Sequence, residues 1–470
     1  MRIALVYPPL LSSVKKSATE NRLGGHQIPL GIFYLASYLR QYGHELMVID
    51  AEALGFNEEI CVEKVIAFKP QIVGISSTTP AFYRALAFAQ HFKGKYSGIP
   101  LILGGNHVTS NPEHALSFDC FSYGVIGEGE ETLRCLVETL EAGNDPREIE
   151  GIAYKNESGA LICTPRRKLI ENLDTIPFPA YDFIPQMSAY MPPPHRYMAS
   201  PVANIITSRG CPNACTFCDQ NVYGRKLRQH SSEHVVDEIV HLYKNYNVRE
   251  ISFNDDTFTI NFGRIRKIFD TLNEQGIKLS WSCTSRINNV TRDEIAYMKK
   301  NGCWRIAFGI ESGDKEILKT IKKNITLEQV REVIGWCHEL GVVATGFFMF
   351  GHPGETRESI EKTISLALSL PLTYMTCSIN TPFPGSPQYQ SIKSFGTVDD
   401  NDWCKFNQYY PVFVPTGLTE DLLTRKYKEI YRRFYLRPRT IYAIGKTFFN
   451  STGPRRFFQI LRVLPYILFG

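Results

Sequence analysis

Short apolar runs alternate with helix-patterned segments along residues 1–144. The apolar runs are RIALVYP, HELMVID, QIVGISSTT, PLILGGNHV and SYGVIGEGE, and segments such as LGIFYLASYLRQYG and EETLRCLVETLEAG separate them. Strands that are apolar throughout and are joined by helices are typical of a parallel sheet covered on both faces. We therefore predict a doubly wound, Rossmann-like α/β domain over residues 1–144, with a ligand site beyond the carboxyl ends of its strands.

A second alternating series occupies residues 199–395. Its strand-like runs are NIITSRG, EISFNDDTF, LSWSCTSRI, RIAFGIESG, VATGFFMFG and YMTCSINTPF. Six such βα units predict a partial (β/α)6 barrel, whose chemistry lies at the carboxyl ends of the strands. Between the two series, residues 145–198 include the proline-rich TIPFPAYDFIPQMSAYMPPPHRY, which predicts an extended linker.

The composition is that of a globular protein of several domains. A chain of 470 residues exceeds one compact core, and 43% hydrophobic with 21% charged residues excludes global disorder. The first residues, MRIALVYPPL, lack the features of a signal peptide, and no apolar run reaches the ~18 residues of a membrane span. We expect a cytoplasmic protein.

The C-terminal region, residues 396–470, is predicted to be helical, basic and aromatic. Between Arg425 and Arg462 the only acidic residue is Glu429, and the many basic residues alternate with Phe, Tyr, Leu and Ile. Amphipathic helices packed on the barrel would give this pattern. A surface that contacts the inner face of a membrane, or that holds a lipid or tetrapyrrole substrate, would give it too. Nucleic acid is not expected as a partner, because no recognition module is present.

Three cysteines stand in the stretch RGCPNACTFC, directly after the first strand of the predicted barrel. Cys211, Cys215 and Cys218 offer soft thiolate ligands, which suit zinc and iron–sulfur clusters. A structural zinc site needs four ligands, and no second cysteine pair follows at the usual spacing. On a 4Fe–4S cluster, three cysteines would leave one iron free for a small molecule. Zinc or incidental cysteines remain the alternative interpretation.

The segment CPNACTFC resembles the C-x-x-x-C-x-x-C loop of the radical SAM superfamily. The resemblance implies that the open iron binds the amino and carboxylate groups of S-adenosylmethionine. Electron transfer from the cluster then yields a 5′-deoxyadenosyl radical. Phe217 matches the aromatic position that packs near the adenine.

Other strand ends of the barrel resemble the S-adenosylmethionine-binding segments of that superfamily. The resemblance assigns cofactor contacts to Asp255 and Asp256 in FNDD, Arg286 after the third strand, Glu311 and Ser312 in GIESG, and Gly351 and Glu355 in GHPGE. FNDD lacks the usual glycines, and its aspartates could instead cap the next helix. Arg286 could equally form a buried structural ion pair.

The N-terminal domain resembles the cobalamin-binding domain of cobalamin-dependent radical SAM enzymes. The likeness rests on IPLGIFYLASYLRQYGHELMVID, VGISSTT, LGGNHVTSNPE and VIGEGEETL. It implies that Gly104 and Gly105 approach the ligand closely, and that the hydroxyls of Ser76, Ser77 and Thr78 meet its nucleotide tail. The D-x-H-x-x-G signature is absent, so no cobalt ligand is assigned. His26 and His107 are candidates for cofactor contact. Another nucleotide is the alternative ligand, although G-x-G-x-x-G is missing.

These resemblances together predict a cobalamin-dependent radical SAM enzyme. Its cofactors would be a 4Fe–4S cluster, S-adenosylmethionine and cobalamin, with an external electron donor of the flavodoxin or ferredoxin type. The expected reaction is methylation of an unactivated carbon in a largely apolar small-molecule substrate. Oxidative cyclisation or rearrangement, as in the anaerobic tetrapyrrole cyclase, is the alternative chemistry. A non-catalytic corrinoid or iron–sulfur sensor is the alternative from another class.

Overall fold

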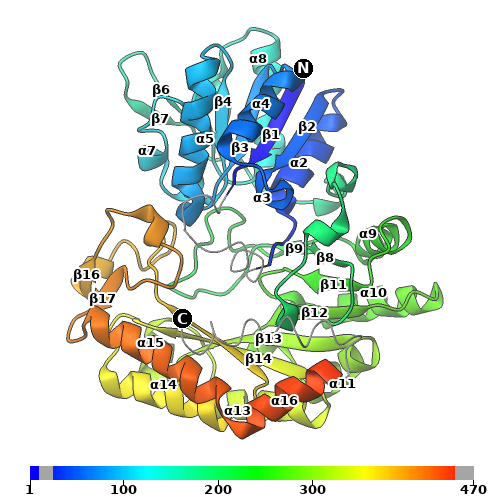
Figure 1. The fold of residues 1–470 in the computed structure, drawn as a ribbon, viewed down its shortest axis with the longest axis vertical. Coiled ribbons are helices and arrows are strands. Elements are labelled where there is room, and N and C mark those ends of the chain that lie inside the picture. The colour runs from blue at the N-terminus through cyan, green and yellow to red at the C-terminus, as the bar shows by residue number, and fades with distance from the viewer. Residues whose placement is uncertain (10–24, 450–470) are drawn as a thin grey trace.

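The computed structural model describes residues 1–9 and 25–449, which form two α/β units stacked one above the other (Figure 1). The upper unit contains a seven-stranded sheet in the order β2-β1-β3-β4-β5-β6-β7. Its strands are β1 (Arg2–Tyr7), β2 (Glu45–Asp50), β3 (Ile72–Ser76), β4 (Leu101–Gly104), β5 (Tyr123–Val125), β6 (Ile152–Lys155) and β7 (Leu161–Cys163). β1 to β5 are parallel, which confirms the predicted doubly wound fold.

Helices cover both faces of this sheet. They are α2 (Leu30–Arg40), α3 (Ala51–Leu54), α4 (Glu58–Phe68), α5 (Phe82–Lys95), α6 (Asn106–Ser110), α7 (Pro112–Ala115) and α8 (Gly129–Glu141), with the 3-10 turns η1 (Thr79–Ala81) and η2 (Pro146–Glu148). α2 and α8 contribute to one apolar core, and α4 and α5 to another. Strands buried in this way on both sides explain the continuously apolar runs of the sequence.

The sheet continues beyond residue 144 into the stretch expected to be a linker. β6 pairs antiparallel with β5, and β7 pairs antiparallel with β6. The turn between them is held by Asn156, whose side-chain oxygen accepts from the backbone N–H groups of Ser158 (3.1 Å) and Ala160 (2.9 Å). Such an Asx-type turn favours a hairpin. The chain after it runs through the short turns η3 (Leu173–Thr175), η4 (Tyr181–Phe183), η5 (Met187–Ala189) and η6 (Pro194–Arg196).

The lower unit is a six-stranded parallel sheet in the order β15-β14-β13-β12-β11-β8. Its strands are β8 (Val202–Ile205), β11 (Glu250–Phe253), β12 (Ser280–Ser285), β13 (Cys303–Glu311), β14 (Val343–Phe350) and β15 (Tyr374–Ile379). The short strands β9 (Ser208–Arg209) and β10 (Arg228–Gln229) pair with each other. All six predicted barrel strands are present, and the predicted partial barrel is confirmed.

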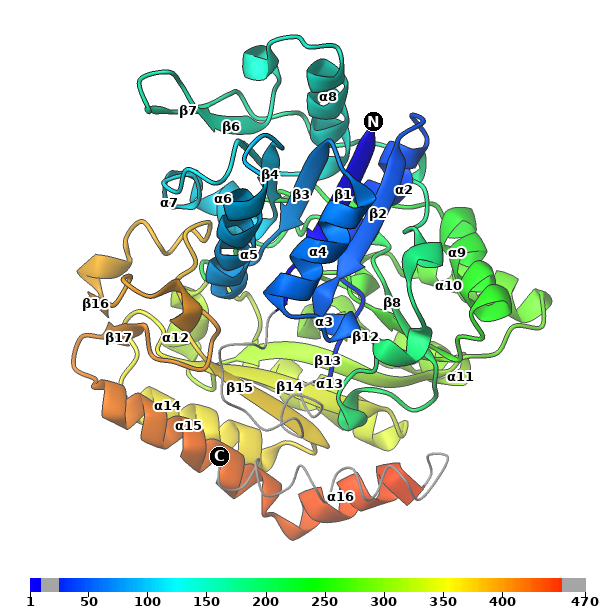
Figure 2. The same cartoon turned by 45° about the horizontal axis from the view of Figure 1, so that its top comes forward.

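The barrel helices lie outside the sheet (Figure 2). They are α9 (Ser232–Asn245), α10 (Phe262–Glu274), α11 (Arg292–Lys300), α12 (Lys315–Thr320), α13 (Leu327–Glu339) and α14 (Arg357–Ser369), with the turns η7 (Phe258–Ile260) and η8 (Ile287–Asn289). Capping boxes begin three of them, at Thr291, Thr326 and Thr356. Each threonine satisfies an N–H group that the first helical turn leaves free.

The C-terminal region closes the outer edge of the barrel. It contains η9 (Ile392–Ser394), β16 (Gly396–Val398), η10 (Trp403–Lys405), β17 (Phe413–Pro415), α15 (Glu420–Tyr435) and α16 (Pro438–Phe449). On α15, the Tyr431 hydroxyl donates to the Cys377 carbonyl (3.0 Å) and accepts from its N–H (3.1 Å). The Tyr435 hydroxyl does the same with Met375, at 2.7 and 3.2 Å. α15 therefore packs on the barrel, as one interpretation predicted; residues 450–470 of the tail lie outside the described residues.

A buried ionic network joins the two units. Arg209 of β9 donates to Glu128 (2.9 Å) and to Glu130 (2.5 Å) of the upper unit. Arg228 of β10 donates to both carboxylate oxygens of Glu128, at 2.9 and 2.8 Å, and to the carbonyl of Ile170 (2.8 Å). All four charged side chains are buried. The strands on either side of the cysteine loop are thus fixed directly to the N-terminal domain.

Candidate functional site

The three cysteines lie on the loop between β9 and β10, at the carboxyl end of β8. Asn213 Nδ2 donates to Cys211 Sγ at 3.2 Å, and Arg286 Nη1 donates to Cys215 Sγ at 3.3 Å. Burial raises the pKa of the Cys218 thiol to about 12, and the nearby Asp256, Cys215 and Cys211 add to that shift. Cys218 therefore lies close to the other two thiols, in surroundings where its own ionised form needs a cation.

The spacing of the cysteine sulfurs separates a cluster from a single metal ion. Within residues 1–9 and 25–449, only Asp174, His230 and His234 bring three ligand atoms within 4.8 Å of one another. The three cysteine sulfurs are spread more widely than that. A single zinc ion, with bonds of about 2.0–2.3 Å, would draw its ligands closer. A multi-iron cluster fits the wider spacing better.

Neighbouring segments hold the cysteine loop on both sides. Gly210 has φ +85°, and a Cβ there would lie 2.3 Å from the Lys226 carbonyl oxygen, so glycine is required. The N–H of Thr216 donates to the Ile321 carbonyl at the end of α12 (3.1 Å). The Thr216 carbonyl accepts from the N–H of Gln388 (2.9 Å), in the segment that follows β15. The loop geometry therefore depends on two other segments of the barrel and on a close approach within the loop itself.

The aspartates of FNDD have different environments. Asp255 is buried, and its Oδ1 accepts from the Thr207 N–H (3.1 Å), the Thr207 hydroxyl (2.9 Å) and the Ser208 hydroxyl. Burial raises the pKa of this carboxyl. Asp256 is exposed at the strand end. The cap of the next helix, α10, is Asn261, so the capping interpretation of the aspartates is wrong.

The residues predicted at the fourth strand end are engaged within the protein. Glu311 has φ +68° and forms a buried ion pair with Lys323 (2.8 Å). Ser312 is fully buried, and its hydroxyl lies 3.2 Å from that of Thr363 and accepts from the Asp314 N–H (3.1 Å). Lys323 also lies over the Phe217 ring, 5.9 Å from the centroid. Lys323, which follows α12, could not be predicted from a sequence motif.

Arg286 lies at the third strand end and is buried. Besides Cys215, its guanidinium donates to the carbonyl of Lys323. Among the described residues these are the hydrogen bonds of the Arg286 side chain, and neither acceptor is a carboxylate. The predicted alternative, a buried structural ion pair, is therefore not formed.

The turn GHPGE after β14 is fixed by a buried carboxylate. Glu355 Oε2 accepts from the N–H groups of Gly351 and His352. Burial raises the pKa of Glu355 to about 8. Asn380 donates to the Gly351 carbonyl (3.1 Å), and the His352 ring lies 5.9 Å from that of Phe217. The turn and the aromatic of the cysteine loop therefore face each other.

A cavity of about 460 Å³ opens beside the cysteine loop. Phe217, Cys218 and Asp219 line it from the loop, Met349, Asn380, Thr381 and Phe383 from the barrel, and Thr78, Thr79, Pro80 and Asn106 from the N-terminal domain; Phe406, Asn407 and Gln408 complete it. This cavity therefore lies between the two units, with a cysteine thiol in its wall.

A second cavity, of about 360 Å³, lies at the carboxyl ends of β1, β3 and β4. Ser76, Thr78, Gly104 and Gly105 line it. Gly105 has φ +102°, and a Cβ there would lie 2.4 Å from the Ser77 carbonyl oxygen. Ser77 is buried and does not line the second cavity. Its hydroxyl donates to the Thr78 carbonyl (2.9 Å).

The two candidate histidines have partners elsewhere. His26 bonds to Asp50 (2.9 Å) and stacks on Tyr190. His107 is fully buried against His114, with 3.0 Å between their ring nitrogens. Neither histidine lines the second cavity.

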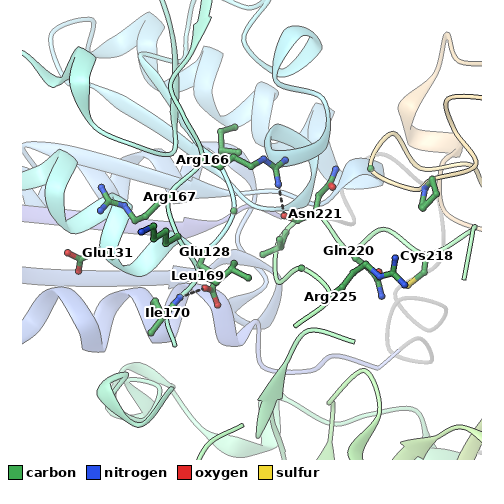
Figure 3. A pocket seen from close by; sticks show the side chains of 17 residues that line it. Glu128, Glu131, Arg166, Arg167, Leu169, Ile170, Cys218, Gln220, Asn221 and Arg225 are labelled. Carbon is green, nitrogen blue, oxygen red and sulfur yellow. Dashed lines mark hydrogen bonds between the residues drawn. The ribbon is translucent and has the colours of Figure 1, made fainter. Parts of the chain in front are cut away.

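A third cavity, of about 420 Å³, lies on the other side of the cysteine loop (Figure 3). Cys218 and Glu128 line it together with the basic residues Arg166, Arg167, Lys168 and Arg225. Arg166 donates to the Asn221 carbonyl (3.0 Å), and the Ile170 N–H donates to Glu128 (2.9 Å). Arg166, Lys168 and Arg225 are exposed.

Two family models match the chain in the order of its two units. The B12 binding domain matches residues 19–137, and the Radical SAM superfamily matches residues 205–367. The uncharacterized methyltransferase PH0819 of Pyrococcus horikoshii is 36% identical over 448 residues, which cover 94% of each chain. The chain is a cobalamin-dependent radical SAM enzyme.

Other relatives of this radical SAM enzyme carry out different reactions. The anaerobic magnesium-protoporphyrin IX monomethyl ester cyclase of Rubrivivax gelatinosus is 28% identical, over 98% of this chain and 85% of the relative. The methyltransferase TsrM of Kitasatospora setae, solved with cobalamin and a 4Fe–4S cluster, superimposes with a TM-score of 0.70 at 17% identity, over 93% and 89% of the two chains. OxsB, solved with aqua-cobalamin and S-adenosylmethionine, gives 0.75 at 18%, over 99% and 70%. These structures share the fold.

The residues of this radical SAM enzyme fit the cofactors of its family. The widely spaced thiols with N–H donors on two sulfurs suit a 4Fe–4S cluster, since hydrogen bonds to sulfur stabilise the charge of a cluster. The second cavity suits the nucleotide tail of cobalamin because Gly104 and Gly105 leave room beside backbone and hydroxyl groups. No histidine lines that cavity among the described residues, which agrees with the missing D-x-H-x-x-G signature.

Proposed function

We propose that this enzyme methylates an unactivated carbon of a small-molecule substrate. The observation that supports this most directly is a shared wall: Thr78 and Asn106 line both the cavity beside the cysteine loop and the cavity at the strand ends of the N-terminal domain. A substrate carbon between the two cavities would be within reach of both cofactors. Methyl transfer to such a carbon requires that arrangement.

The roles of the chain's own residues follow from their contacts. Cys211, Cys215 and Cys218 would hold the cluster, with Asn213 and Arg286 donating hydrogen bonds to its thiolates. When bound, the cluster supplies the electron that cleaves S-adenosylmethionine to a 5′-deoxyadenosyl radical, and methylcobalamin supplies the methyl group.

The remaining predicted residues form the walls around S-adenosylmethionine. Phe217 would face the adenine, with Gly351 and Glu355 setting the turn opposite to it. Asp256 is exposed at the strand end and can reach the amino group. Asp255 and Ser312 would not contact the cofactor. They would stabilise the strand ends instead, since both accept hydrogen bonds from neighbouring backbone N–H groups.

Cyclisation is the second candidate reaction. The cyclase relatives align over nearly the whole chain, so that chemistry occurs in proteins that resemble this one along its length. A largely apolar substrate such as a tetrapyrrole or lipid would suit either reaction. A sensor role is disfavoured, because the relatives that align over most of the chain include enzymes of both kinds.

We further propose that an acidic electron donor of the flavodoxin or ferredoxin type docks over the third cavity. Arg166, Lys168 and Arg225 give its rim a positive charge, and Cys218 lies in its wall. Opposite charges steer such transient encounters.

Membrane contact through the C-terminal region also stays a proposal. On α16, Ile441 and Tyr442 are exposed. The described part of the chain has no helix of the length and hydropathy that a membrane span needs.

Product analysis tests the proposed function. The protein is purified anaerobically with cobalamin, its cluster is reconstituted, and it is incubated with S-adenosylmethionine, a strong reductant and a cell extract. Methyl transfer predicts that 5′-deoxyadenosine and S-adenosylhomocysteine accumulate together, and that Cys215→Ala forms neither. 5′-Deoxyadenosine alone would favour cyclisation or rearrangement. Neither product from protein with an intact cluster would refute the enzymatic proposal.

A further inference from the structure

A polar cavity of about 270 Å³ lies inside the partial barrel, separate from the three cavities described above. It is lined by Gln27, Arg196, Ser252, Phe253, Asn254, Cys283, Thr284, Arg305, Ala307 and Phe347. Most of these residues come from β11 to β14; Asn254 directly follows β11, Arg196 belongs to η6, and Gln27 lies in the segment before α2. The cavity is therefore in the interior of the barrel, where a substrate would enter.

Two arginines give this cavity a positive charge. Arg305 on β13 is only 9% exposed, and within the described part of the chain its Nε has no hydrogen-bond partner. Burial and the nearby Arg196 lower the pKa of Arg305 to about 10, so it remains charged at neutral pH. Two guanidinium groups at one buried cavity repel each other unless an anion lies between them.

One carboxylate near Arg305, that of Glu250, favours its charged form, but burial and Arg196 outweigh this effect on the pKa of Arg305. Glu250 is fully buried, and its carboxylate accepts from the N–H groups of Met198 (2.5 Å) and Ala199 (2.7 Å) and from the Trp304 indole (2.9 Å). It does not line the cavity. His195 is neutral, because burial and the two arginines lower its pKa to about 3. The cavity therefore lacks an anion on its own surface.

The position of the cavity connects it with the cobalamin site. Gln27 and Asn254 line both this cavity and the second cavity, and Asn254 Nδ2 donates to Gln27 Oε1 at 3.3 Å. We propose that this cavity, here called the anion cavity, binds a carboxylate or phosphate group of the substrate and so places the rest of the molecule beside cobalamin. Guanidinium groups bind such oxyanions with paired hydrogen bonds. The inference rests on the proposed function.

Binding of simple anions tests the anion cavity directly. Reconstituted full-length enzyme is titrated calorimetrically with inorganic phosphate and with butyrate at constant ionic strength. We expect saturable binding that weakens at least about tenfold in Arg196→Gln and in Arg305→Gln, the loss expected for one charged hydrogen-bond pair. Arg147→Gln is the matched control, since Arg147 is exposed in a surface pair with Asp145, and it should bind as the wild type does. Tighter phosphate binding would indicate a phosphorylated substrate, and tighter butyrate binding a carboxylic acid.

Two further readouts separate this inference from the proposed function. Cobalamin content shows whether a variant has folded, and Arg196→Gln should retain cobalamin because Arg196 is only partly buried, even if Arg305→Gln does not fold. The slow formation of 5′-deoxyadenosine without substrate, measured in the wild type, reports on the proposed function alone. Wild-type enzyme that forms 5′-deoxyadenosine but binds neither anion, or a variant that binds both as well as the wild type, would overturn the anion cavity and leave the function standing. Anion binding without any S-adenosylmethionine cleavage would overturn its role as a substrate site.

Discussion

The substitution Glu128→Gln should separate the two units of the enzyme. Glu128 accepts from Arg209 (2.9 Å), from Arg228 (2.9 and 2.8 Å) and from the Ile170 N–H (2.9 Å), all in buried surroundings. Glutamine keeps the shape of the side chain but removes its charge, and its amide points N–H groups at a guanidinium. Arg209 retains Glu130, whereas Arg228 is left with the carbonyls of Ile170 and Tyr223.

The expected loss of stability follows from that uncompensated charge. Removing the charge of one partner in a buried ion pair lowers the free energy of unfolding by about 3–5 kcal/mol. At about 1.4 kcal/mol for each factor of ten, the equilibrium between docked and separated units shifts by roughly two to four orders of magnitude. The second cavity, proposed to hold cobalamin, should be disturbed when the two units separate, because Glu128 also lines it.

Urea unfolding with simultaneous measurement of cobalamin release provides the assay. Glu171→Gln is the matched control, since Glu171 pairs with Lys226 nearby but both side chains are more than half exposed, and its loss should cost under about 1 kcal/mol. The double variant Glu128→Gln with Arg228→Met should recover part of the stability, because it removes the unpaired charge. If Glu128→Gln unfolds at the same urea concentration as Glu171→Gln, the reasoning is wrong.

Three further predictions concern the site. Cys218→Ala should lose the visible absorption of the cluster and all 5′-deoxyadenosine formation while retaining cobalamin; retained cleavage activity would contradict the ligand assignment. Gly105→Val should weaken cobalamin binding at least about tenfold, since a Cβ at Gly105 would lie 2.4 Å from the Ser77 carbonyl oxygen, and an equilibrium titration checks it. The pKa of Glu355 is raised from 4.5 to about 8 in the folded state. The stability contributed by its protonated form is therefore fully present below about pH 4.5 and is lost as the pH rises through 8, by about 5 kcal/mol in total. The melting temperature of Glu355→Gln should therefore fall less than that of the wild type between pH 6 and 9. An equal fall in both proteins would argue against a buried neutral carboxyl.

The sequence predicted those features that depend on local pattern. Continuous apolar runs identified the parallel strands, and the spacing of three cysteines pointed to the loop that is proposed to hold the cluster. The hairpin of β6 and β7 was missed, because its short strands follow a segment of turns and are held by Asn156. Pairing on the inner face of the barrel could not be predicted either. Lys323 and Glu311 form an ion pair because α12, which lies between them in the sequence, reverses the direction of the chain. Arg305 lies in an apolar run that predicts a buried strand and gives no indication of a cavity.

The contacts between α15 and β15 explain why the barrel stops at six strands. Two residues four positions apart on a helix are separated by about 6 Å along its axis. This spacing is close to the roughly 6.6 Å between alternate residues of a strand. Tyr431 and Tyr435 can therefore occupy successive N–H and C=O groups of Cys377 and Met375, as a neighbouring strand would. A free sheet edge invites further strands or another chain. Here a helix takes that position, so no seventh strand pairs with β15, and the sheet stays open between β15 and β8.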